Sequence, residues 1–143
     1  MRWLLAVALL LAQSSLATTI VPTGVATPLL ENVALAATGS ATVTLVPGSE
    51  VDLVYNISGS VTGTLPTVVF TVADADPLNP ATAITGGQTA SSASITSASS
   101  GVVTISTTHS TAELVTWTVG GTLPSFGGTY LTLVYKQPVP FAQ

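Results

Sequence analysis

Two stretches of the chain alternate between apolar and polar residues, and the same four letters, GTLP, interrupt both. The first is VDLVYNISGSVTGTLPTVVFTV, residues 51–72, and the second is LVTWTVGGTLPSFGGTYLTLVYK, residues 114–136. A period of two, built from Val, Ile, Thr, Tyr and Phe, is typical of β-strands that are buried on one face. The sequence therefore predicts a strand on each side of both GTLP segments, with the segments themselves as Gly/Pro turns.

The two GTLP segments, residues 63–66 and 121–124, indicate a duplicated strand-turn-strand unit. They lie about half a sandwich domain apart in the sequence, so we expect one copy in each sheet. Chance similarity in a chain rich in Thr and Gly is the alternative explanation.

Turn residues divide the rest of the chain into short segments of strand character. The expected strands are 33–37, 41–46, 51–58, 66–72, 91–97, 101–106, 113–119 and 129–135. No helical pattern follows Ala17, and Pro or Gly clusters separate the strands. Short strands at this spacing predict an all-β fold, an antiparallel β-sandwich or jelly-roll-like single domain.

The chain divides into three parts. Residues 1–32 comprise a hydrophobic signal-like segment, MRWLLAVALLLAQSSLA, and an extended arm that contains prolines. Its apolar run is shorter than the roughly 20 residues that span a bilayer. The segment is consistent with two interpretations: a cleaved secretory signal, or a retained arm buried against a neighbouring subunit. Residues 33–136 are the expected β-sandwich domain, and residues 137–143 are an extended tail.

Large apolar side chains supply the expected core and assembly contacts. We expect Trp117 at the centre of the core, together with Tyr55 and Phe70, because these residues lie on the apolar side of the alternation. The full set of core and assembly candidates is Tyr55, Phe70, Trp117, Phe126, Trp3, Leu4 and Leu5.

Charge is scarce. Only 6% of residues are charged, against about 25% in an ordinary soluble domain. Two basic and six acidic residues exclude electrostatic binding to nucleic acid, which requires clustered Lys and Arg. The chain has no cysteine, which excludes disulfides and thiolate metal sites. A surface this poor in charge favours a chain that lies against copies of itself or other proteins.

Few residues offer chemistry. Asp74, Asp76 and Asn79 could begin a calcium loop, although the turn glycine and closing glutamate of an EF-hand are missing and a polar β-turn explains them as well. His109 is the only histidine, and no Gly-x-Ser-x-Gly elbow supports a Ser-His-Asp triad with Asp52 or Asp74. The acids lie at expected turns and strand starts, so we do not expect two of them to converge. We expect no catalytic residue, no cofactor and no enzyme activity.

One pattern resembles a known family. Val-Thr-Gly-Thr-Leu-Pro-Thr at 61–67, followed by the alternating residues 68–72, and the related stretch 117–126 resemble small β-sandwich virion proteins of tailed bacteriophages. Proteins of that kind decorate heads or form part of tails, often as trimers with extended N-terminal arms. The resemblance covers about residues 51–136 and implies a structural role.

Two hypotheses from different classes follow. The first is a non-enzymatic structural subunit of a virus particle, of the head-decoration or tail-associated type, which forms a homo-oligomer and contacts other virion proteins. The alternative is a secreted cell-surface module, an adhesin or pilus-like subunit, with residues 1–17 as a cleaved signal peptide and no other contact with a membrane. A small secreted enzyme or calcium-dependent carbohydrate binder is a third, remoter idea.

Overall fold

The computed structural model describes residues 18–20 and 26–136, and within them every regular element is a β-strand. The expected all-β class is confirmed. The strands are β1 (Thr18–Ile20), β2 (Ala26–Leu35), β3 (Gly39–Thr44), β4 (Glu50–Ile57), β5 (Val61–Asp76), β6 (Asn79–Ala83), β7 (Thr89–Ser91), β8 (Ser99–Ile105) and β9 (Ala112–Lys136).

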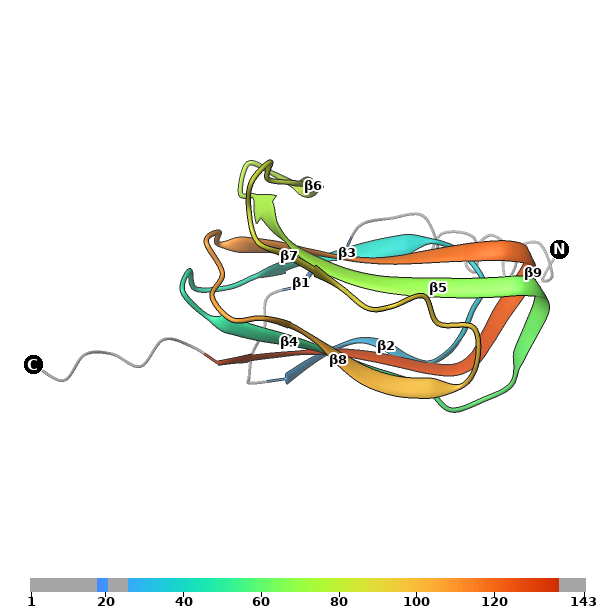
Figure 1. The fold of residues 1–143 in the computed structure, drawn as a ribbon. Coiled ribbons are helices and arrows are strands. Elements are labelled where there is room, and N and C mark those ends of the chain that lie inside the picture. Colours follow the sequence, from blue (N-terminus) through green and yellow to red (C-terminus); the bar gives the residue numbers. More distant parts are fainter. Residues whose placement is uncertain (1–17, 21–25, 137–143) are drawn as a thin grey trace, which may run out of the picture.

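One long strand, β9, organises the sheet by belonging to two layers. Its first part pairs with β3 and β5, and its last part pairs with β2 and β4. The first layer therefore runs β1-β3-β9-β5-β7 and the second runs β2-β9-β4-β8. All pairings are antiparallel except β1 with β3. Figure 1 shows the two layers stacked, with β9 passing from one to the other at one end. The two-layered antiparallel arrangement is thus as predicted.

The GTLP segments differ most from expectation. They do not end strands, because pairing continues through both of them within β5 and β9. They also do not lie one in each sheet: they pair with each other, with Thr64 opposite Thr122. The strands expected at 113–119 and 129–135 are consequently one strand, and the strand expected at 66–72 is the middle of a longer one. Positive φ angles within the segments allow the chain to bulge without leaving its partner.

The N-terminal arm expected over residues 18–32 is partly built into the sheet. β1 pairs with β3, and β2 starts at Ala26 and pairs with the last part of β9. The sequence pattern does not predict β2 because this strand is irregular. It contains Pro28, has three register shifts, and bends at Asn32, where φ is 53°. Edge strands tolerate proline and bulges, which erase the period of two. Of the segment expected over 91–97, only the end of β7 and an isolated bridge from Ile95 to Val68 are paired. The short β6 was not expected.

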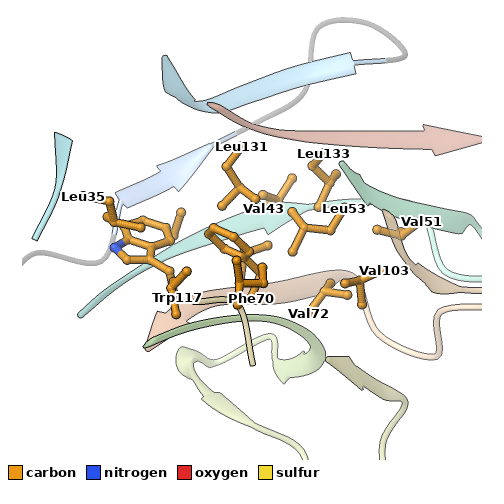
Figure 2. Close-up of a cluster of buried hydrophobic side chains, with 14 of the residues drawn as sticks. Leu35, Val43, Val51, Leu53, Phe70, Val72, Val103, Trp117, Leu131 and Leu133 are labelled. Atoms are coloured by element: carbon orange, nitrogen blue, oxygen red, sulfur yellow. The ribbon is translucent and has the colours of Figure 1, made fainter. Parts of the chain in front are cut away.

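The core lies between the two layers. Phe70 and Phe126 are fully buried, Trp117 is almost so, and Tyr55 stacks on Phe70 with ring centroids 5.1 Å apart. Figure 2 shows Phe70 and Trp117 among aliphatic side chains of both layers, including Leu53 and Leu131. Trp3, Leu4 and Leu5 lie outside the described residues.

Candidate functional site

Two regions of the sandwich depart from ordinary packing, and they lie at opposite ends of the β5–β9 pairing. We call residues 61–67 together with residues 120–126 the GTLP corner. There β5 and β9 cross side by side from one layer to the other. We call Asp74, Gln88, His109 and Glu113 the acid end. Asp74 and Glu113 are directly opposite each other near the far end of the same pairing.

The GTLP corner has a local two-fold symmetry. Gly63 and Gly121 have φ angles of 109° and 103°, and Leu65 and Leu123 have φ angles of 49° and 50°. A Cβ atom on Gly63 would lie 2.7 Å from the Leu123 carbonyl oxygen, and one on Gly121 would lie 2.6 Å from the Leu65 carbonyl oxygen. Identical sequences that run antiparallel to each other thus adopt the same conformation and make reciprocal contacts. The symmetry explains why the same four residues occur twice.

The leucines of the corner are strained and point into solvent. Leu65 is 83% exposed and Leu123 is 86% exposed. For an L-residue other than Gly, the left-handed conformation costs roughly 1–2 kcal/mol. No charged residue occurs in the sequence from Leu53 to Ala73 or from Leu114 to Tyr135. The corner therefore presents two apolar side chains on an uncharged background.

The acid end buries two carboxyl groups. Asp74 and Glu113 are both fully buried, and they extend the inward-facing alternation of β5 and β9. The Asp74 carboxylate accepts hydrogen bonds from the backbone N–H of Gln88 at 2.7 Å and of His109 at 3.1 Å. Neither carboxyl oxygen of Glu113 has a hydrogen-bond partner. Asp74 is thus stabilised by peptide groups, whereas Glu113 is not.

Burial and, to a smaller extent, the adjacent Asp74 carboxyl group together raise the pKa of Glu113 to about 9. Removal of water disfavours the ionised form, and a second negative charge nearby acts in the same direction. Glu113 is consequently protonated at neutral pH. This places an uncharged carboxylic acid inside the sandwich beside Asp74.

The calcium candidates do not come together as ligands. Asp74 is buried and held by backbone N–H groups, while an Asp76 carboxylate oxygen accepts a hydrogen bond from the Leu78 backbone N–H at 2.9 Å. Asp76 and Asn79 are register partners that flank the turn between β5 and β6. This arrangement corresponds to the polar β-turn that the sequence offered as the alternative to a calcium loop. In the described part of the chain, no group of three His, Asp or Glu side chains converges as a metal would require.

His109 does approach an acid. Its Nδ1 lies 3.9 Å from Asp74 Oδ2, and its side chain is largely exposed. The neighbouring Ser110 hydroxyl is buried and donates to the Ala75 carbonyl oxygen at 2.6 Å, so it is not directed at the imidazole. Asp52 instead accepts a hydrogen bond from Thr104 on the second layer. These contacts do not form a Ser-His-Asp arrangement.

The expectation that no two acids converge was wrong, since Asp74 and Glu113 do. The signal was present in the sequence: Asp74 follows Phe70 and Val72 at a spacing of two, and Glu113 precedes Val115 and Trp117 at the same spacing. Extending the alternation by one step places both acids on the buried face.

Little charge remains on the surface. The chain has eight charged residues, of which Arg2 lies outside the described part and Asp74 and Glu113 are buried. Glu50 and Lys136 form an ion pair at 2.6 Å. The remaining charged residues are Glu31, Asp52 and Asp76.

Comparison with known proteins identifies no relative: no protein-family model, curated protein or solved structure matches the chain. Among the residues described, no helix is long and apolar enough to cross a membrane.

Proposed function

We propose that this chain is a non-enzymatic structural subunit of a virus particle, of the head-decoration or tail-associated type, which acts through contacts with neighbouring subunits. The observation that carries the proposal is the GTLP corner. Its two leucines combine backbone strain with exposure to water, so neither feature stabilises the isolated chain.

The choice of leucine at these positions supports an interface. Glycine adopts a positive φ without steric cost, and an exposed leucine gains almost nothing from burial in the folded monomer. Contact with a partner would bury both side chains and recover the hydrophobic free energy, about 1.5–3 kcal/mol for each fully buried leucine. Residues held in sparsely populated backbone conformations cluster at functional sites.

The surface chemistry agrees with permanent association. Subunits in obligate assemblies bury large surfaces that are depleted in charge. Here three unpaired acids are the only charged groups left on the described surface once the buried acids and the Glu50–Lys136 pair are removed. The resemblance of residues 61–72 and 117–126 to phage virion proteins supports a particle as the setting.

The second candidate is a secreted cell-surface module. The signal-like pattern of residues 1–17, a short apolar run followed by small residues, supports this candidate. In that case the corner would anchor the module to a neighbouring subunit of a pilus or to a surface protein.

Sedimentation of material from the native source tests the proposal. A virion subunit cosediments with particles in a density gradient, and its intact mass gives the N-terminus. If the chain stays with soluble protein and starts near Thr18, the virion assignment is wrong and the secreted module replaces it.

A double variant tests the role of the corner itself. L65S with L123S should lower the fraction of the chain that is bound to particles at least tenfold. L78S is the matched control, because Leu78 is 95% exposed but has no positive φ. Equal binding of the double variant and the wild type would remove the corner from the interface.

A further inference from the structure

Within residues 18–20 and 26–136, the second layer ends on one side in an edge strand, β8, that carries none of the usual protection. Protein sheets guard exposed edges with short strands, charged side chains, prolines or bulges, because a free row of backbone groups pairs readily with another strand. Among the described strands β8 pairs only with β4, through seven consecutive register positions from Ser99 opposite Ile57 to Ile105 opposite Val51, without a shift. Its sequence, SSGVVTI, has no charge and no proline.

The opposite edge of the same layer shows the contrast. β2 contains Pro28 and Glu31, shifts register three times and bends at Asn32. At the edges of the first layer, β1 and β7 have only three residues each, and the five-residue β6 contains Pro80 and pairs with β5 with a register shift. Among the described strands, β8 is therefore the one long, regular and uncharged edge.

We propose that β8 pairs antiparallel with β8 of a second copy of this chain, about a two-fold axis at Val102. The dimer would join the two second layers into one continuous sheet. This inference goes beyond the proposed function, because it applies equally to a virion subunit and to a secreted module.

The sequence of β8 is its own complement in this arrangement. Val102 lies opposite Val102 of the second copy, Ser100 opposite Thr104, and Ser99 opposite Ile105. Outward-facing residues meet outward-facing ones, since Ser100, Val102 and Thr104 are exposed while Val103 and Ile105 are buried. No pair opposes like charges, which would destabilise a sheet.

The outer face also continues across the axis. Val102 is 57% exposed and is the register partner of Val54, which is exposed as well. Pairing would extend this into a row of four valines across both copies. The nearest acid on that face is Asp52, opposite Thr104. From strand spacing and rise, the two Asp52 residues would lie about 20 Å apart, beyond the Debye length of about 8 Å at physiological salt.

Because the chain has no cysteine, a single substitution can report this contact. Directly opposed residues of antiparallel strands have Cα atoms about 4.5–5.5 Å apart, which is within the range of a disulfide. Under mild oxidation the full-length V102C variant should form a disulfide-linked dimer nearly completely. V46C is the control, because Val46 is exposed in the turn between β3 and β4, away from the edge.

Native mass spectrometry and light scattering of the purified full-length chain supply the second measurement. Wild type and V46K should be dimers, or multiples of dimers, whereas V102K should dissociate with a dimer dissociation constant at least tenfold higher. Circular dichroism should show the same β content for all three proteins. A monomeric wild type at 100 µM, or V102C that crosslinks no better than V46C, would overturn the proposal. Either result would leave the sedimentation test of the proposed function unaffected.

Discussion

The GTLP corner and the acid end both give up stability, but in opposite ways. The corner places apolar side chains in water on a strained backbone, and the acid end places two carboxyl groups in the core on a regular backbone. The corner can recover its cost only by contact with something outside the chain. The acid end recovers part of its cost internally, through the hydrogen bonds to Asp74 and the protonation of Glu113. The comparison therefore distinguishes the GTLP corner, which faces outward, from the acid end, which is internal and whose stability we expect to depend on pH.

The largest expected effect concerns the acid end. Because the folded-state pKa of Glu113 is raised to about 9 from 4.5, the folded state holds one more proton than the unfolded state between those pH values. The stability that this protonation contributes is fully present below pH 4.5 and is lost as pH rises towards 9, by about 1.4 kcal/mol per unit and on the order of 6 kcal/mol in total. Compared with wild type, E113Q should lack this decline in urea unfolding measured from pH 4 to 10.

The exposed E31Q variant is the control for that experiment and should follow the wild-type pH profile. Parallel curves for E113Q and wild type would show that Glu113 is ionised in the folded state, and the acid end would then be no different from the surface acids. His109 faces the pair from the loop before β9, with its Nδ1 3.9 Å from Asp74 Oδ2.

The next effect concerns the close approach within the corner. G63A and G121A should each lower the free energy of unfolding by about 2–4 kcal/mol, because alanine must adopt a positive φ and its Cβ meets the opposite GTLP backbone. Gly86 supplies the control: its φ is +82°, but a Cβ there meets nothing within 4 Å. G86A should therefore lose only about 1 kcal/mol. Thermal unfolding of the three variants separates the cost of the contact from the cost of the φ angle.

The smallest effect has an unusual sign. L65G and L123G should each stabilise the chain by about 0.5–1 kcal/mol, because relief of the left-handed strain exceeds the added flexibility of the unfolded chain. L78G, at a leucine that is equally exposed but unstrained, should be neutral or lose up to about 1 kcal/mol. A loss of stability in both corner variants would mean that these leucines stabilise the monomer, and the contrast with the acid end would fail.

The sequence predicted the strands and the core where alternation was complete. Phe70 and Trp117 follow the period of two, and both are buried between the layers. The alternation also contains the acid pair, because Asp74 and Glu113 continue the buried face of their strands; acids are more typical of turns, which hides this signal. The pairing register between β5 and β9 decides only that the two buried acids lie opposite each other.

The corner could not have been predicted in the same way. Leucine rarely adopts a positive φ, so Gly-Thr-Leu-Pro indicates a turn that ends a strand. Whether two distant copies lie in separate sheets or pair with each other depends on long-range pairing, which local patterns do not report. The prediction of an extended arm missed β2 for a related reason. Pro28 and the bulge at Asn32 remove the period of two from this edge strand, which forms through its pairing with β9.

The double membership of β9 has a consequence for biosynthesis. Neither layer has its central strand until residues 112–136 have been made, since β3 and β5 on one side and β2 and β4 on the other are held together through β9. During translation the preceding strands can therefore form only partial pairings, such as β4 with β8 and β5 with β7, and neither layer can be completed until β9 arrives. A chain truncated before β9 would therefore lack the strand through which the remaining strands of each layer are joined.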